Sequence, residues 1–367
     1  MKLLFLSFYF PPDLCAGSFR ANSLLSALKK KTKREDSITI LTSKPNRYSE
    51  FIENSLGHEI RGNIEIIRIR LPSHKNQFLD QSICFFIYFL KVIIHLRGKK
   101  YDLVAATSSR LFTAFLAKIV SQWKKIPLYL DVRDIFYDVF KDLSKDSIFK
   151  IFLPFIKIIE RYTFSGVKKI NIVSEGFKSY FKDNYNKVDI STYTNGIDSE
   201  FLSYNWSSQK NMRIKVCYAG NIGDGQGLHK ILPDLAITFA DTHDFYVLGN
   251  GGKTKDLKNI LTKKQISNVY LLPATNRKNL IKYYDSSDIL FLHLNDYPAF
   301  RRVLPSKLFE YASTGKPILA GVSGYAQKFI KEEIRNATIF NPCNLTEAKN
   351  ALKNIDLNLT DRSGFIE

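Results

Sequence analysis

The chain alternates short apolar runs with longer stretches in which apolar residues recur every three or four positions. Short apolar runs are typical of buried strands and the longer stretches of amphipathic helices, so this order predicts repeated βα units and a parallel sheet. In the first half of the chain the predicted strands are residues 3–7, 37–41, 64–69, 103–106, 127–131 and 169–173. In the second half they are residues 215–219, 245–248, 269–272, 289–292, 317–321 and 338–340.

Each set of strands predicts one sheet of about six strands with covering helices, the usual size of an open doubly wound α/β fold. The segment TYTNGIDSEFL between the two sets is rich in turn residues, so we place a domain boundary there, with domains at 1–195 and 196–367. Ligands bind outside the carboxyl ends of parallel strands. The two Rossmann-like domains are therefore expected to face a central cleft that holds the ligands.

Two loops with glycine join a predicted strand to a predicted helix. In FPPDLCAGSFR, Gly17 and Ser18 stand at the mouth of the first helix, although many βα turns contain glycine for geometry alone. In YAGNIGDGQGLHKIL, four glycines fall within eight residues (220, 223, 225 and 227). The second loop is neither a Walker loop nor a dinucleotide fingerprint. Close approach of backbone N–H groups to a diphosphate is the physical explanation that we prefer.

A short helix is predicted in AFRRVLPSKLFEYAS, residues 299–313. Pro305 suits the first helical turn, and Gly315 followed by Lys316 and a proline is a stop signal. Lys307 and Glu310 are three residues apart, so they lie on neighbouring parts of the helix surface near its N-terminal end. This pair forms either part of a ligand site or an ordinary surface ion pair.

Charge and composition narrow the class of protein. The chain has 45% hydrophobic and 24% charged residues, as folded soluble proteins do, and four cysteines far apart, which predict neither a zinc cluster nor a disulfide framework. Its net charge is +19, and residues 1–195 hold 32 Lys and Arg against 18 Asp and Glu, a net charge of +14. A polyanionic partner is indicated, either nucleic acid, an acidic bilayer surface or a phosphorylated substrate.

Two stretches mix apolar, aromatic and basic residues as helices in a membrane interface do: residues 82–100 (SICFFIYFLKVIIHLRGKK) and 148–169 (IFKIFLPFIKIIERYTFSGVKK). The first is too short and too interrupted by Lys91 to span a bilayer. For the first stretch we favour the membrane surface. For the second, we favour a helix that faces the core of the first domain. The start, MKLLFLSFYFPP, is expected to be a buried strand rather than a secretory signal.

Six short motifs follow one another along the chain: PP-x4-G, DVRD, VSEGFK, TNGID, AG-x-x-G-x-GQG and PSKLFEYASTGKP, the last of them followed by a predicted strand. This order resembles the GT-B-fold retaining glycosyltransferases of glycosyltransferase family 4 over nearly the whole chain. It is most similar to bacterial members that build O-antigen or capsule, including N-acetyl-L-fucosamine transferases. In such proteins a last helix crosses back to the first domain, and NLTDRSGFIE corresponds to its start, so we expect either a truncated chain or a different closure.

The resemblance implies a nucleotide-sugar site in the second domain. Glu310 is expected to bind the ribose hydroxyls and Lys307 to face the diphosphate, with Ser306 and Leu308 beside them on the same helix. The backbone of LLPATNR is expected to hold the base, which makes Pro273, Ala274 and Thr275 candidates. In the glycine loop the expected donor-contacting residues are Gly220, Asn221, Gly223, Gly225 and Gln226.

The chain departs from the family at three positions. Many members have an arginine and a lysine in the glycine loop that bind the diphosphate, where this chain has Asn221 and Gln226. Many also have a glutamate eight residues before the ribose-binding one, where this chain has Arg302. We expect Arg302, with Arg301, to supply the cation that the diphosphate needs. The alternative is that Arg302 points into solvent.

For the first domain the resemblance implies acceptor binding and help with catalysis. Gly17, Ser18 and Arg20 are the candidates for the acceptor. In DVRDIFYDVF we assign Asp134, together with Arg133, to the reacting centre. The alternative is that Asp134 caps the helix that follows, as aspartate often does.

The sequence thus predicts a cytoplasmic, peripheral membrane glycosyltransferase of the hexosyltransferase class. The expected donor is a UDP-linked nucleotide sugar that carries an N-acetylated deoxyamino sugar, and the expected acceptor is a polyprenyl-diphosphate-linked saccharide. We expect no cofactor and no metal, because no Asp-x-Asp or His-carboxylate cluster stands at a strand end. The alternatives are a nucleotide-sugar epimerase or hydrolase of the same fold, and a nucleic-acid-binding protein. The sequence contains no recognisable nucleic-acid-binding module, which argues against the last alternative.

Overall fold

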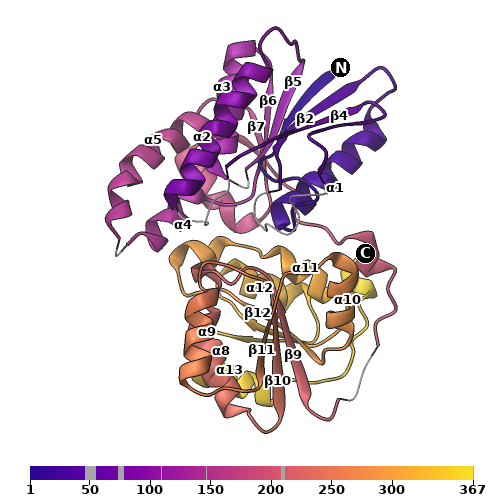
Figure 1. Cartoon of the computed structure of the whole chain (residues 1–367), viewed down its shortest axis with the longest axis vertical. Helices are drawn as coiled ribbons and strands as arrows, with labels where there is room; N and C mark the ends of the chain where they lie inside the picture. The colour runs from indigo at the N-terminus through magenta and orange to yellow at the C-terminus, as the bar shows by residue number, and fades with distance from the viewer. Residues whose placement is uncertain (46–54, 73–77, 109, 146, 208–210, 367) are drawn as a thin grey trace. The chain divides into compact units, whose positions relative to one another are not determined.

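The computed structural model describes residues 1–45, 55–72, 78–108, 110–145, 147–207 and 211–366. The chain divides into two compact units, an N-terminal unit of Met1–Thr194 and a C-terminal unit of Asn195–Glu367 (Figure 1). Each unit is built on its own largely parallel sheet.

The described part of the N-terminal unit forms an eight-stranded sheet in the order β3-β4-β2-β1-β5-β6-β7-β8. All neighbouring strands are parallel except β3, which runs antiparallel to β4. The strands are β1 (Lys2–Leu6), β2 (Ser37–Ser43), β3 (His58–Arg61), β4 (Ile64–Ile69), β5 (Leu103–Ser108), β6 (Leu128–Val132), β7 (Lys169–Ile172) and β8 (Asp189–Thr192).

The expectation of about six strands is wrong for this unit, because the sheet carries an additional short strand at each edge. The six predicted strands are present, and β3 (HEIR) and β8 (DIST) are the additions. Each has four residues of mostly polar character, so neither shows the apolar run that identifies a buried strand. Such strands pair on one side only and need little apolar surface.

Helices of the N-terminal unit follow most strands. α3 packs on β5 and β6 and contacts α2 on one side and α5 on the other, so these three helices form one layer. On another part of the sheet, Ala21 and Leu25 of α1 pack in a core cluster with Leu3, Phe5 and Ile38. The helices are α1 (Ala16–Lys31), α2 (Phe78–His95), α3 (Leu111–Lys124), α4 (Phe136–Leu143), the 3-10 helix η2 (Ile148–Phe152), α5 (Leu153–Phe164), the 3-10 helix η3 (Glu175–Phe177) and α6 (Lys178–Asn184).

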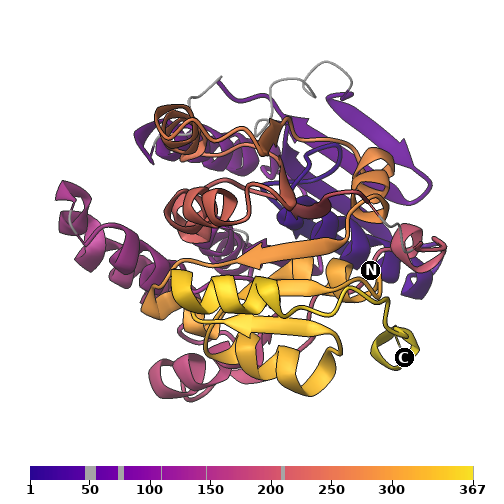
Figure 2. The same cartoon turned by 90° about the horizontal axis from the view of Figure 1, so that it is seen from below.

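The C-terminal unit has a six-stranded parallel sheet in the order β11-β10-β9-β12-β13-β14, which confirms the predicted strands. Numbered from the first strand of the unit, this order is 3-2-1-4-5-6, the doubly wound arrangement. Helices lie on both faces of the sheet (Figure 2). The strands are β9 (Ile214–Ala219), β10 (His243–Leu248), β11 (Val269–Leu272), β12 (Ile289–His293), β13 (Ile318–Gly321) and β14 (Ala337–Phe340).

Two separate apolar clusters stabilise this sheet. One contains Leu290, Leu308 and Tyr311, and the other contains Val216, Ile231 and Leu235. The helices are α7 (Ser199–Leu202), the 3-10 helix η4 (Asp224–Gln226), α8 (Leu228–Thr238), α9 (Thr254–Lys263), α10 (Arg277–Asp285), the 3-10 helix η5 (Pro298–Arg302), α11 (Ser306–Ala312), α12 (Tyr325–Glu333), α13 (Leu345–Lys353) and α14 (Ser363–Ile366).

Candidate functional site

The glycine loop, residues 220–227, lies where the strand order of the C-terminal sheet reverses. It follows β9, which pairs with β10 on one side and β12 on the other. Connections from these neighbouring strands diverge to opposite faces, and ligands of doubly wound folds bind at this point. α8 begins at Leu228 directly after the loop, with Gly227 as its N-cap in the left-handed region at φ 61°. The loop therefore occupies the position at which the fold predicts a ligand.

Asn221 and Gln226, which replace two expected cations, bind one another. Asn221 Nδ2 donates to Gln226 Oε1 at 2.8 Å, and the N–H of Gly223 donates to the same oxygen at 3.3 Å. The two amide side chains thus close the loop on itself, whereas an arginine and a lysine in these places would repel each other. The loop holds its shape without a cation of its own.

The segment after β12 supports the glycine loop, a role that the sequence reading missed. The N–H of Asn295 donates to the carbonyl of Gly225 at 2.9 Å, and Asn295 Nδ2 donates to the carbonyl of Asp224 at 2.8 Å. The hydroxyl of Tyr297 donates to Asp224 Oδ2 at 2.7 Å. Asn295 follows a strand of the switch point, and this was the one signal that could have identified it.

His293 at the end of β12 also fixes the loop. Its Nδ1 lies 2.6 Å from the carbonyl oxygen of Gln226, and its Nε2 accepts from the N–H of Cys343 at 3.1 Å. Burial lowers the pKa of His293 to about 4, so the imidazole is neutral and Nδ1 carries the proton. With both nitrogens engaged in this way, His293 is a structural residue.

Close packing inside the protein accounts for several of the loop's glycines. A Cβ atom at Gly220 would lie 2.7 Å from Lys307 Cε, and one at Gly225 would lie 2.8 Å from the ring of Phe300. The expectation that these glycines exist to admit a diphosphate is thus not needed to explain them. The packing also shows that the Lys307 side chain lies against the first residue of the glycine loop.

A second glycine segment, Gly249–Gly252 after β10, packs against this loop and was not predicted. Gly249 has φ 136°, and a Cβ atom there would lie 1.9 Å from the carbonyl oxygen of Gly220. The N–H of Ile222 donates to the carbonyl of Asn250 at 3.1 Å. The sequence GNGG directly after a strand was the available signal.

Glu310 of α11 lies in a cluster of charged and polar side chains. Arg277 Nη1 donates to Glu310 Oε1 at 2.7 Å, and the hydroxyl of Tyr284 donates to Glu310 Oε2 at 3.3 Å. Lys307 Nζ lies 3.8 Å from Glu310 Oε2, which places the pair on neighbouring parts of the helix surface as predicted. This pair is not an ordinary surface ion pair, because Glu310 is buried and shared among three partners.

The cluster keeps Glu310 ionised. Burial alone would raise the pKa of Glu310, but Lys307, Arg277 and the hydrogen bond from Tyr284 outweigh burial and hold the pKa below its usual value. Burial lowers the pKa of Lys307, and the attraction of Glu310 offsets this only in part. Carboxylate oxygens that retain free lone pairs in such surroundings can accept hydrogen bonds from sugar hydroxyls.

Arg277 is a residue that the sequence reading missed. It lies at the first position of α10, and its Nη2 forms an ion pair with Asp198 while Nη1 binds Glu310. One guanidinium group therefore bridges the TNGID segment and the α11 helix. Its only signal in the sequence was its place at the end of LLPATNR, next to the candidate base-binding backbone.

The two arginines before α11 lie on η5. Arg301 is exposed, with Nη2 at 3.7 Å from Asp296 Oδ1, and Arg302 is half-buried. The expected contact of Arg302 with a diphosphate stays a prediction. Ser306 is half-buried at the start of α11, whereas Leu308 is 0% exposed within the apolar core. The Leu308 side chain is consequently removed from the candidates for donor binding.

The candidate base-binding segment follows β11. Pro273 is exposed, and Ala274 and Thr275 are half-buried. Within the described residues, no hydrogen bond involves the main chain of Ala274 or Thr275, while Asn276 next to them caps α10. Main-chain donors and acceptors are therefore available for a ligand at this position.

In the N-terminal unit, Gly17 and Ser18 form the buried first turn of α1. Cys15, the N-cap, makes no side-chain hydrogen bond to the helix, and the Ser18 hydroxyl has no hydrogen-bond partner among the described residues. Their expected role in acceptor binding stays a prediction.

Arg20, the third acceptor candidate, binds other residues of the N-terminal unit. Its Nε and Nη2 donate to Asp131 at 3.2 and 2.7 Å, and its two terminal nitrogens also donate to the carbonyls of Thr194 and Tyr193. Asn171 Nδ2 donates to Asp131 as well, at 2.7 Å. Because the guanidinium group is used inside the unit, Arg20 is explained better as an anchor of the chain before the unit boundary than as an acceptor ligand.

Arg133 and Asp134 follow β6. The N-cap of α4 is Ile135 and makes no side-chain cap hydrogen bond, so Asp134 does not cap this helix. Asp134 is exposed, yet desolvation by the protein around its carboxyl group raises its pKa to about 6, and Arg133 offsets only part of this shift. Arg133 Nε and Nη1 have no hydrogen-bond partner in the described part of the chain. The pair combines a titratable carboxyl group with a cation that can bind a ligand.

In the residues that the structure describes, no group of three or more His, Cys, Asp or Glu side chains is arranged to hold a metal ion. His229, beside the glycine loop, lies 3.9 Å from Asp224, and burial lowers its pKa. A neutral, partly buried His229 is consistent with a packing role.

Comparisons with known proteins agree with this geometry. The family model described as "Glycosyl transferases group 1" matches residues 204–363, which is less than half of the chain and nearly all of the C-terminal unit. The C-terminal unit is therefore similar to this family over nearly its whole length. No curated protein sequence matches the chain at a significant level.

Solved structures resemble the chain over nearly its whole length. Sucrose-phosphate synthase from Thermosynechococcus elongatus has a TM-score of 0.75 at 11% identity and covers 100% of this chain and 91% of its own. WaaG, a glycosyltransferase involved in lipopolysaccharide biosynthesis, has a TM-score of 0.69 at 16% identity, with 99% and 92% covered. Anabaena HepE in complex with UDP-glucose has a TM-score of 0.67 at 16% identity, with 96% and 89% covered. These similarities confirm the GT-B fold.

Proposed function

We propose that the protein is a retaining, metal-independent glycosyltransferase that moves a sugar from a UDP-sugar to a polyprenyl-diphosphate-linked saccharide in surface polysaccharide synthesis. The observation that carries the proposal is the cluster of Arg277, Lys307 and Glu310 beside the glycine loop of a glycosyltransferase group 1 domain. Its ionised carboxylate and its lysine match the ribose and the diphosphate of a nucleotide sugar. The structure of HepE with UDP-glucose supports the choice of UDP.

On the donor side, each part of the nucleotide sugar has a partner of suitable chemistry. Glu310 accepts hydrogen bonds from the ribose hydroxyls through its remaining lone pairs. The free main chain of Ala274 and Thr275 holds the base. Lys307, beside Gly220, faces the diphosphate, and Arg302 adds the charge that the glycine loop lacks.

During transfer, the positive groups stabilise the departing diphosphate, the electrostatic role that usually dominates such chemistry. Asp134 and Arg133 act on the acceptor side, where a carboxylate orients the attacking hydroxyl group. No side chain is assigned as a nucleophile. A front-face reaction, in which the leaving phosphate oxygen takes the proton of the acceptor, then gives retention of configuration.

The acceptor lipid implies action at the cytoplasmic face of a membrane. No helix in the described part of the chain is both long and apolar enough to cross a bilayer. α2 instead exposes Ile83, Phe86, Leu90 and Ile94 along one face, with Phe86 61% exposed. This apolar face and the net charge of +14 in residues 1–195 suit adsorption to an anionic surface. The resemblance of the fold to WaaG, which is involved in lipopolysaccharide biosynthesis, supports the pathway.

The test is incubation of the purified protein with radiolabelled UDP-sugars, with and without lipid extracted from a bacterial inner membrane. Label transferred to lipid is the expected result. Release of free sugar or an epimerised nucleotide sugar without lipid would favour a hydrolase or epimerase.

Glu310→Gln should lower UDP affinity by about 1 to 3 kcal/mol. Lys328→Gln, in an exposed ion pair on α12, is the matched control.

A further inference from the structure

The helix pair η2–α5 carries a second apolar face that points away from the unit. Ile156, Ile159 and Phe164 are buried on the inner side of α5. Six further apolar or aromatic residues are exposed on η2 and α5, among them Ile148 at 82%, Ile151 at 72% and Ile158 at 65%. We call these six residues the α5 ridge: Ile148, Ile151, Phe152, Phe155, Ile158 and Tyr162.

The spacing of the ridge shows that it is one surface. Ile151, Phe155, Ile158 and Tyr162 are four, three and four residues apart, which places them on one side of a helix. A helix that only covers a core carries polar residues on its outer side. The sequence reading of this stretch as a core-facing helix is thus incomplete, since α5 is apolar on its inner and on its outer side. Contiguous exposed apolar surface of this kind marks an interaction site.

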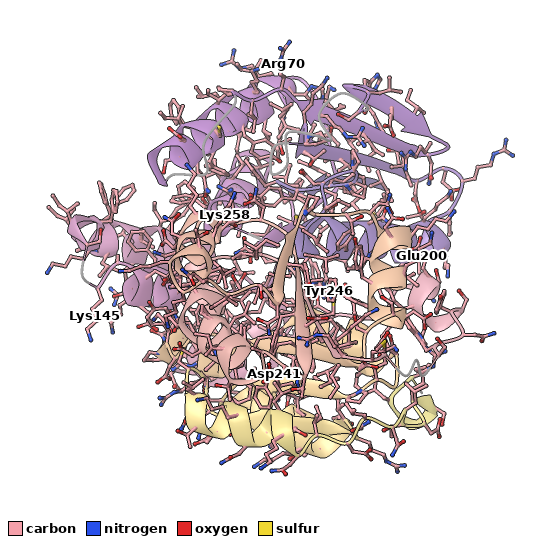
Figure 3. The ribbon with its side chains drawn as sticks, turned by 60° about the horizontal axis from the view of Figure 1, so that its bottom comes forward. Arg70, Lys145, Glu200, Asp241, Tyr246 and Lys258 are labelled. Carbon is pink, nitrogen blue, oxygen red and sulfur yellow. The ribbon has the colours of Figure 1, made fainter. Side chains whose placement is uncertain are left out.

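The charges around the ridge are complementary to an anionic surface. Residues 141–169 contain seven Lys and Arg and three Asp and Glu. One of the acids, Glu160, is buried, and its Oε1 accepts from Tyr180, Tyr185 and Lys157. Lys150 within η2 is exposed, and Figure 3 shows Lys145 at the periphery of the unit, near the start of η2. Two copies of this basic surface would repel each other, which argues against a symmetric dimer.

The ridge belongs to the same helical layer as the exposed face of α2. α3 lies between α2 and α5 and contacts both. At the end of α3, Trp123 is partly exposed, and Lys124 Nζ lies 4.2 Å from the centre of its ring. Tryptophan with a neighbouring lysine is characteristic of membrane interfaces.

We propose that the α5 ridge is a docking surface for an anionic lipid bilayer and inserts into its interface. This inference deepens the membrane partner of the proposed function and rests on it. Basic residues bring the surface to the bilayer, and the apolar side chains enter the boundary between head groups and acyl chains. The α5 ridge and α2 together form two contacts on one layer, which orients the N-terminal unit on the membrane.

The test measures binding of the whole chain to vesicles of phosphatidylcholine with and without phosphatidylglycerol. The double variant Ile151→Ser/Phe155→Ser should bind anionic vesicles about 100-fold more weakly, about tenfold for each residue. The matched control is Ile60→Ser/Ile237→Ser, which changes two exposed residues outside the helical layer and should bind like the wild type. Thermal stability and UDP affinity should stay unchanged in both variants.

A single variant, Phe155→Trp, reports insertion directly. Its fluorescence should shift to shorter wavelength with anionic vesicles and should be quenched by brominated acyl chains. Equal vesicle binding by the double variant, no binding by the wild type, or no spectral shift would overturn the proposal. A wild-type dimer that the double variant dissociates, without vesicle binding, would assign the ridge to a second copy instead. If UDP binding persists in these cases, only the membrane-docking proposal fails, and the proposed donor site is not contradicted.

Discussion

Arg277 allows a sharp test of the donor site, because it holds Glu310 in place without being expected to touch the sugar. The change Arg277→Gln removes the 2.7 Å hydrogen bond to Glu310 and the ion pair with Asp198. The side chains of Arg277 and Glu310 are 15% and 11% exposed, so water replaces little of the lost interaction. Removing one partner of a buried pair costs about 3 to 5 kcal/mol, and the partial exposure here reduces this to about 2 to 3 kcal/mol.

The effect on nucleotide binding should be smaller than the effect on folding. Lys307 and Tyr284 still contact Glu310 in the variant, so the carboxylate loses its fixed orientation but not its charge. We expect UDP affinity to fall by about 1 to 2 kcal/mol, which is roughly 5- to 30-fold. Calorimetric titration with UDP measures this loss, and thermal unfolding measures the loss of stability. Arg277→Lys keeps the charge but cannot bridge Glu310 and Asp198, so it should rescue only part of the affinity.

The pH dependence gives an independent check. The pKa of Glu310 in the folded protein lies below its ordinary value of 4.5. The ionised Glu310 carboxylate therefore makes its full contribution to stability above pH 4.5, and this contribution is lost as the pH falls through the folded-state pKa. Arg277→Gln removes part of the cause of this shift. The difference in unfolding free energy between wild type and variant should therefore shrink below pH 4.5. A variant with wild-type UDP affinity would refute the positioning role, even if its stability fell.

Three further changes probe other parts of the site. Asp134→Asn should lower turnover about 100-fold or more and leave UDP affinity unchanged. In the wild type, turnover should decrease when the pH is lowered through about 6, because the Asp134 carboxylate then takes up a proton. Normal turnover in the variant would exclude the assignment. Arg302→Ala should weaken UDP binding about tenfold and uridine binding hardly at all, and equal losses would contradict a diphosphate contact. Gly220→Ala would bring a Cβ atom within 2.7 Å of Lys307 Cε, so displacement of the lysine should weaken UDP binding, and unchanged affinity would separate Lys307 from the diphosphate.

Local patterns in the sequence predicted most of the fold because strands and helices have their own periods. The six strands of the C-terminal sheet were all identified from apolar runs. The edge strands β3 and β8 were missed because each is polar and short, and pairing with one neighbouring strand defines it. For residues 148–169 the sequence allowed both an interface helix and a core-facing helix, and we favoured the second, because a run of apolar residues does not reveal which of them the rest of the fold covers.

The sequence by itself determined the βα order, the glycine loop after β9 and the pairing of Lys307 with Glu310 one helical turn apart. Only the tertiary structure decided which side chains share a site. Arg277 reaches Glu310 across 33 residues, and Arg20 reaches Asp131 across 111, and neither pair follows a local spacing. Likewise, the hydrogen bond between Asn221 and Gln226 depends on the curvature of their loop. Spacing along the chain predicts neighbours on one element, whereas contacts between elements depend on how the sheet and its helices pack.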